Sequence, residues 1–151
     1  KCQCYVSLVL VTGVVESFLK VTVQLYSASL CNMMSEGDNI TIHCSTSQTD
    51  RESITLFRRF TKETEVFNLY KETKKVTLQD EFKSRMYNEG EFHNMSLTIK
   101  HLTTEDSGVY WCTYIRFNKA NIEAESVLLV VTGELIIKRG KYYGQSCVFC
   151  V

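Results

Sequence analysis

Thr104-Glu105-Asp106-Ser107-Gly108-Val109-Tyr110-Trp111-Cys112 is the stretch that decides the fold of this chain. The part Asp106-Ser107-Gly108 has the residue types of a tight turn, because short polar side chains and glycine tolerate turn conformations. The residues Val109, Tyr110 and Trp111 that follow it are strong strand formers. The stretch therefore predicts a turn that leads directly into a strand, with a tyrosine two residues before a cysteine.

An upstream segment offers a second strand that ends in a cysteine. In Ile40-Thr41-Ile42-His43-Cys44 apolar and polar residues alternate. Side chains of a strand point to opposite faces in turn, so Ile40, Ile42 and Cys44 are expected inside, whereas Thr41 and His43 are expected outside. The pattern predicts a half-buried strand whose cysteine enters the core.

A tyrosine two residues before a cysteine, after a turn of this kind, is the tyrosine corner of an immunoglobulin sandwich. In such a corner the phenol, here that of Tyr110, bonds to upstream backbone, and the cysteine reaches a partner on the opposite sheet. Cys44 is the partner offered upstream of Cys112, and the long spacing between them suits a V-type domain with extra middle strands. We expect an all-β immunoglobulin V-type sandwich of two antiparallel sheets joined by one inter-sheet disulfide.

The other strands are expected from short apolar or alternating segments. Leu56 stands where most immunoglobulin domains have a tryptophan on the disulfide, so neighbouring side chains must fill the missing volume or a cavity remains. A turn is expected at Asn88-Glu89-Gly90. The expected strands, in chain order, cover residues 21–26, 54–59, 65–70, 76–78, 82–87, 95–100 and 126–132.

Composition limits the classes of function. The chain has 17 basic and 17 acidic residues, which argues against nucleic acid or anionic lipid as the main partner. Seven cysteines indicate an oxidising compartment. With an odd number, at least one thiol is unpaired or pairs between chains, and the pairing of Cys31, Cys147 and Cys150 is left open.

The ends of the chain suggest three parts. Residues 1–17 are expected to be a signal peptide, since an apolar run follows Lys1 and small residues Val15 and Ser17 precede a cut, although an ordinary buried strand is the alternative. Residues 18–132 form the V-type domain. Residues 133–151 form a tail that lacks the roughly 18 apolar residues of a membrane helix, so the protein is either secreted or the sequence stops before a membrane anchor.

From Val23 to Thr132 the sequence resembles a V-set immunoglobulin domain of a leukocyte receptor, a resemblance that rests on Cys44, Arg85, Leu102, Asp106, Gly108, Tyr110 and Cys112. It implies that Arg85 and Asp106 form a structural ion pair. Cys-Ser-Thr-Ser at 44–47 and Leu56 are similar to the single-V-domain T-cell antigen numbered seven in the cluster-of-differentiation series. The Tyr-Trp-Cys ending is also similar to polymeric immunoglobulin receptor-like and fish novel immune-type receptors. The resemblance disfavours a rearranged antigen receptor, because the joining motif Gly-x-Gly is replaced by residues 123–126.

Two glycosylation sequons and one apolar patch are the candidate surface features. Asn39 and Asn94 begin the sequons, and the alternation turns both outward on the same sheet. On the other sheet the alternation turns a second set of side chains outward. Exposed apolar patches mark interaction sites, whereas coverage of Trp111 by its own loop is the alternative. The residues expected to bind a partner are Phe57, Arg59, Trp111, Thr113 and Ile115.

No catalytic or metal site and no cofactor is predicted. The three histidines, His43, His93 and His101, fall on separate segments, and no nucleophile elbow or glycine-rich phosphate loop is present. Cys147-x-x-Cys150 has no second pair to complete a zinc site and favours a terminal or interchain disulfide or an acylation site. We expect the ligand-binding ectodomain of an immune-cell surface receptor that recognises a protein partner, on a cell or in solution, through the unglycosylated sheet and its adjoining loops. The alternatives are a secreted or membrane adhesion module acting by self-association and a cysteine-based redox or metal protein.

Overall fold

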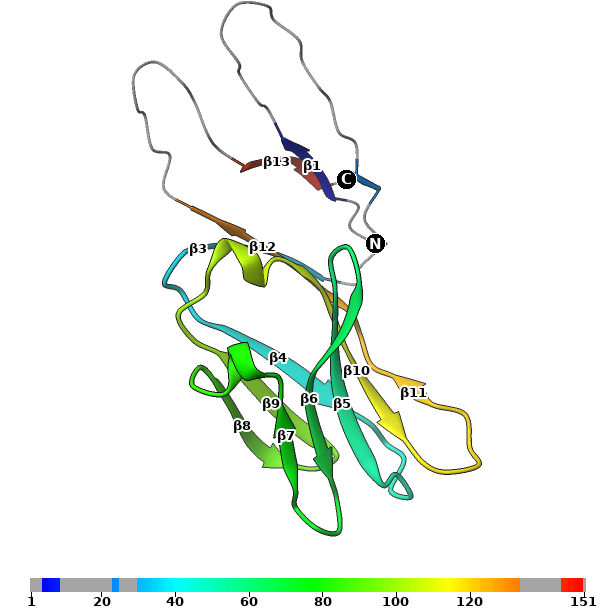
Figure 1. Ribbon diagram of the computed structural model, residues 1–151. Helices are drawn as coiled ribbons and strands as arrows, with labels where there is room; N and C mark the ends of the chain where they lie inside the picture. Colours follow the sequence, from blue (N-terminus) through cyan, green and yellow to red (C-terminus); the bar gives the residue numbers. More distant parts are fainter. Residues whose placement is uncertain (1–3, 9–22, 25–29, 134–144, 151) are drawn as a thin grey trace, which may run out of the picture.

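The computed structural model describes residues 4–8, 23–24, 30–133 and 145–150, and side chains within 30–133. Most of this part is β-strand (Figure 1). Two short 3₁₀ helices, η1 (Asp80–Phe82) and η2 (Thr104–Asp106), connect strands. The strands of the central region are β3 (Leu30–Ser35), β4 (Ile40–Ser45), β5 (Ser53–Arg59), β6 (Glu63–Tyr70), β7 (Val76–Leu78), β8 (Met86–Glu91), β9 (Asn94–Ile99), β10 (Gly108–Ile115), β11 (Ile122–Glu123) and β12 (Val127–Thr132).

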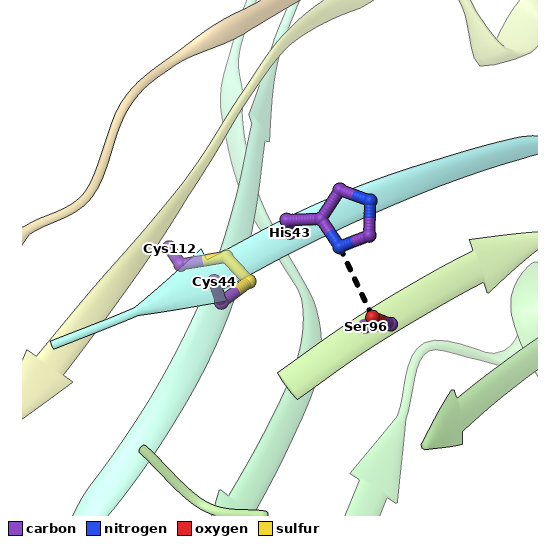
Figure 2. Close-up of a disulfide and its surroundings, with 4 residues drawn as sticks. All are labelled: His43, Cys44, Ser96 and Cys112. Atoms are coloured by element: carbon purple, nitrogen blue, oxygen red, sulfur yellow. Dashed lines mark hydrogen bonds between the residues drawn. A yellow bond between two sulfur atoms is a disulfide. The ribbon is translucent and has the colours of Figure 1, made fainter. Parts of the chain in front are cut away.

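The central strands form two sheets. The larger has the order β3-β12-β10-β5-β6-β7, with β11 paired to β10, and the smaller has the order β4-β9-β8. Only β3 and β12 run parallel among these pairs; the others are antiparallel. A disulfide between Cys44 on β4 and Cys112 on β10 joins the sheets, with Cα atoms 5.8 Å apart (Figure 2). The predicted two-sheet sandwich and its inter-sheet disulfide are thus confirmed.

A third small sheet is formed by segments near the ends of the chain. β1 (Cys4–Leu8) pairs antiparallel with both β13 (Gln145–Cys150) and β2 (Val23–Gln24). Of the strand expected at 21–26, only residues 23–24 lie within the described part. Most of the predicted signal peptide and tail lie outside the described residues, and the division of the chain into three parts stays a prediction.

The core lies between the two sheets and is built from the inward positions of alternating strands. Ile40, Ile42 and Cys44 are buried while the residues between them are exposed, as the alternation predicts. Leu56, which replaces the usual tryptophan, is fully buried. Large aromatic side chains belong to the same core cluster as Leu56. Among them, Tyr114 and Phe92 pack edge to face with ring centroids 5.8 Å apart.

Three sequence-based expectations about strands were wrong or incomplete. Of the strand expected at residues 82–87 only residues 86–87 belong to β8, because Phe82 ends η1 and residues 83–85 form a turn. The strand β3 was not predicted, because buried and exposed residues do not alternate regularly along it. It forms through parallel pairing with β12. The turn expected at residues 88–90 is also wrong, because β8 continues to Glu91 and the reversal occurs at residues 92–93. Gly90 lies inside this strand with a φ of +92°, and an added Cβ would approach the Asn94 carbonyl oxygen to 2.6 Å. Glycine is therefore required there for close backbone approach rather than for a turn.

The corner before β10 holds the base of the sandwich together. The Asp106 carboxylate accepts hydrogen bonds from both terminal nitrogens of Arg85, at 2.7 Å each, and from the Thr103 backbone N–H at 2.8 Å. The Tyr110 hydroxyl donates to the Asp106 carbonyl oxygen at 2.7 Å. Gly108 has a φ of +153°, and an added Cβ would lie 3.0 Å from the Arg59 carbonyl oxygen. The structure thus places Arg85, Asp106 and Tyr110 in the contacts that the resemblance implied.

We expect Asp106→Asn to lower the free energy of unfolding by about 3 kcal/mol near neutral pH, because Arg85 would lose its carboxylate in a largely buried position. Burial by itself raises the pKa of Asp106, but the hydrogen bonds from Arg85 and Thr103 outweigh it and hold that pKa below 3.8. The stabilisation is therefore fully present above pH 3.8 and is lost as the pH falls through the lower pKa of the folded state. Urea unfolding of both proteins between about pH 7 and pH 2 measures this difference; a difference that stays constant over the range would contradict it.

The two fully buried tyrosines of β10 should respond oppositely to removal of the hydroxyl. Tyr110→Phe should cost about 1–3 kcal/mol, because the Asp106 carbonyl loses its 2.7 Å hydrogen bond. The Tyr114 hydroxyl finds no partner among the described residues, and burial raises its pKa to about 12. Tyr114→Phe should therefore be neutral or stabilise by up to about 1 kcal/mol. Thermal unfolding of the two variants side by side tests this, and equal losses would refute it.

Candidate functional site

The outer face of the larger sheet carries the aromatic side chains that the sequence assigned to partner binding. Phe57 on β5 and Trp111 on β10 are directly opposite each other in the strand register. Their rings stack with centroids 5.6 Å apart and an interplanar angle of 21°. Both side chains are partly exposed. A stacked aromatic pair on an open sheet surface offers a rigid apolar contact area.

Arg59 completes this group. It lies two residues beyond Phe57 on the same face of β5, and its guanidinium lies 5.1 Å from the centroid of the Trp111 ring. Arg59 also forms an ion pair with Glu63 across the β5–β6 hairpin. These contacts hold the guanidinium over the aromatic ring, so Phe57, Trp111 and Arg59 form one layered cluster, which we call the aromatic face.

Thr113 does not belong to this exposed surface, contrary to the sequence-based expectation. It points to the outer face as predicted but is only 4% exposed. It lies opposite Thr55, whose hydroxyl accepts a hydrogen bond from the Asn68 side-chain amide at 2.7 Å. Thr113, Thr55 and Asn68 lie side by side on β10, β5 and β6 and are all buried. Ile115 is partly buried and sits opposite Ser53, at the loop end of the face.

Next to the aromatic face, Val109, Leu128 and Val130 form a second buried cluster. Trp111 and Cys31 pack against it from the side. One flank of Trp111 is therefore supported by apolar side chains of β10 and β12, and the other by Phe57 and Arg59. This support fixes the orientation of the indole ring.

The outer face of the smaller sheet has a different character. Its side chains pair across the strands through polar contacts, and the Thr41 and Thr98 hydroxyls are 2.9 Å apart. Figure 2 shows a second such contact, in which His43 Nδ1 lies 3.1 Å from the Ser96 hydroxyl. Both predicted glycosylation residues, Asn39 and Asn94, are exposed and lie at opposite ends of this sheet. The Asn39 side-chain oxygen accepts a hydrogen bond from the His101 backbone N–H at 3.0 Å.

A second feature lies at the end of the sandwich where three loops meet; the sequence indicated that loops take part in binding but not the cleft between them. A cleft of about 460 Å³ lies there, and side chains of both charges line it: Thr49, Asp50, Arg51, Glu52, Lys71, Glu72, Lys74 and Arg116. Beside it Phe117 is 78% exposed. The cluster of basic residues around residue 117 was a usable signal, but the meeting of loops at residues 46–52, 71–75 and 116–121 could be seen only in the fold.

The described residues contain no group of three or more histidine, cysteine or acidic side chains that could hold a metal ion. Within the same residues no helix is long and apolar enough to cross a membrane.

Comparison with known proteins agrees with this geometry. A family model of the immunoglobulin V-set domain matches residues 31–132. No curated protein matches the chain significantly. The matched range begins in β3 and ends with β12, so it includes both sheets, the disulfide and the tyrosine corner. Because the match covers more than half of the sequence, the chain belongs to the immunoglobulin V-set family.

Proposed function

We propose that this V-set domain is the ligand-binding ectodomain of an immune-cell surface receptor and that it recognises a protein partner through the aromatic face. V-set domains typically bind ligands or mediate adhesion, and they are generally not enzymes. The leukocyte-receptor resemblance of residues 23–132 supports the receptor role, and the receptor subgroup stays a prediction.

The observation that carries the proposal is the layered stack of Phe57, Trp111 and Arg59 on an open sheet surface. Tryptophan and arginine are the residue types most enriched among binding hot spots. The stack is held rigid before any partner arrives, so little side-chain freedom would be lost on binding.

The two sequons support the choice of face. Asn39 and Asn94 lie at opposite ends of the smaller sheet, whose outer surface carries paired polar side chains and the exposed Tyr87. Glycans attached there would cover that sheet and leave the aromatic face open. We extend the proposal to a location on the cell surface or in secreted form, in keeping with the disulfide.

The test replaces one residue on each sheet. We expect Trp111→Ala to weaken binding by about tenfold or more, because a buried aromatic anchor contributes about 2 kcal/mol. Thr98→Ala removes only a surface hydroxyl contact with Thr41 and should leave binding unchanged. Fluorescent multimers of the parent and each variant are titrated on a panel of leukocyte lines, after melting curves confirm that all three proteins fold.

Equal binding by the Trp111 variant and the parent, or a loss only with the Thr98 variant, would disprove the choice of face. If no line binds the parent and its mass in sedimentation rises with concentration, self-association through the same face replaces the receptor proposal.

A further inference from the structure

An exposed aromatic side chain lies near one of the two sequons on the smaller sheet. Tyr87 on β8 is 48% exposed, and the Lys100 ammonium lies 4.5 Å from the centroid of its ring. The Lys100 N–H donates to the Arg85 carbonyl at 2.9 Å, so the chain after β9 still pairs with the segment before β8. On its other side, the register of β4 against β9 places Asn39 beside Lys100. Asparagine, lysine and tyrosine therefore follow one another across the outer surface of the sheet.

The Asn39 side chain is held in one orientation. Its Oδ1 accepts a hydrogen bond from the His101 backbone N–H at 3.0 Å. His101 has a φ of +52°, so this bond connects the turn after β9 to the start of β4. An N-linked glycan is attached to the other amide atom, Nδ2, and leaves Oδ1 able to accept a hydrogen bond. The bond to His101 can therefore persist in glycosylated Asn39 and direct the first sugar away from the turn.

The surface between Asn39 and Tyr87 has the groups that a sugar chain can contact. Two strand spacings and one two-residue step separate the two Cα atoms, which places them roughly 12 Å apart, within reach of the core sugars of a glycan. Lys100 and the hydroxyls of Thr41 and Thr98 lie on this surface and can hydrogen-bond to sugar hydroxyls. The ring of Tyr87 offers a flat apolar area on which the C–H face of a sugar can pack.

Asn94 has different surroundings, although it belongs to the same sheet. It begins β9 at the hairpin end, opposite Ser45 on β4 and Glu91 on β8. Phe92, the aromatic residue two positions before it, is only 7% exposed. A glycan on Asn94 therefore lies beside hydroxyl and acidic groups, and we expect it to extend into solvent.

We propose that Asn39 carries an N-linked glycan whose core N-acetylglucosamine units pack across Lys100 onto the ring of Tyr87. The donor is an oligosaccharide on a polyprenyl diphosphate. A bond forms between Asn39 Nδ2 and the sugar C1, the C1–O bond to the diphosphate breaks, the lipid diphosphate leaves, and the amide loses one proton. The packed glycan stabilises the smaller sheet and lies over its edge strand β8, where it hinders pairing with another chain. This inference goes beyond protein recognition, since it assigns a structural role to the sheet opposite the aromatic face.

The experiment uses the full chain, secreted from mammalian cells behind an added leader, in two variants that keep one sequon each. Asn94→Gln keeps the Asn39 glycan, and Asn39→Asp keeps the Asn94 glycan together with an oxygen acceptor for the His101 N–H. Mass spectrometry of glycopeptides measures occupancy. Peptide N-glycosidase then removes each glycan and leaves aspartate. We expect removal to lower Tm by about 3–6 °C in Asn94→Gln and by less than about 1 °C in Asn39→Asp.

A matched pair of tyrosine variants tests the contact itself. In the Asn94→Gln background, Tyr87→Ala should abolish the Tm loss on deglycosylation, because the sugar then has no ring to pack on. Tyr70, 53% exposed on β6 of the larger sheet, is the control, and Tyr70→Ala should leave that loss unchanged. Proton NMR of the isotope-labelled glycan gives a second measurement that needs no tyrosine variant. Stacking on Tyr87 should move N-acetylglucosamine resonances upfield of those in the free glycopeptide.

Several results would overturn the inference. They are an Asn39 that carries no glycan, an equal Tm change for the two glycans, and sugar resonances that match those of the free glycopeptide. A Tm loss that persists in Tyr87→Ala, or that disappears equally in Tyr70→Ala, would also contradict it. These outcomes leave the proposal for the aromatic face untouched, because that proposal is tested by partner binding of the Trp111 variant.

Discussion

Asp106 is the residue on which the rest of the sandwich depends. Its carboxylate accepts hydrogen bonds from both terminal nitrogens of Arg85 and from the Thr103 N–H, and its carbonyl oxygen accepts one from the Tyr110 hydroxyl. One residue thereby fixes the segment before β8, the 3₁₀ turn and the start of β10. A buried carboxylate is unfavourable unless it is fully compensated, and here its acceptors are occupied from several directions. The geometry of β10, and therefore of Trp111 and Cys112, follows from this junction.

The disulfide and the core act on the same strand from the other side. Cys112 connects β10 to β4 through the disulfide. Closing so long a loop lowers the conformational entropy of the unfolded chain, which stabilises the folded state by about 4 kcal/mol in the chain-entropy model. With its inward face fixed in this way, β10 must present its alternate residues outward. Trp111 is then held between an apolar cluster and the Phe57–Arg59 layer, which makes a partly exposed tryptophan a rigid feature of the surface.

Two surfaces result, and they differ in physical character. The aromatic face is a flat sheet surface whose side chains are ordered by stacking. The loops at residues 46–52 and 116–121, at one end of the sandwich, are ordered by ion pairs between side chains far apart in sequence, with Arg116 and Lys119 reaching Asp50. On the outer surface of the smaller sheet, hydroxyl and imidazole groups contact one another across the strands, as in the Thr41–Thr98 pair. Its exposed aromatic side chain is Tyr87 on β8, with the Lys100 ammonium 4.5 Å from the ring centroid.

The sequence by itself determined the two-sheet fold, the disulfide, and which faces of β4, β5 and β10 point inward, because turn chemistry and period-2 alternation are local properties of the chain. Tertiary structure alone decided how far each outward side chain is exposed. Thr113 and Trp111 have the same orientation, but Thr113 is buried in a row with Thr55 and Asn68 on the neighbouring strands, whereas Trp111 is partly exposed. The strand at Leu30–Ser35 and the reversal at residues 92–93 depend on pairing with β12 and β9 rather than on local pattern. Phe117 is conspicuous only once three distant loops have met, since exposure is a property of packing between segments that the order of residues does not reveal.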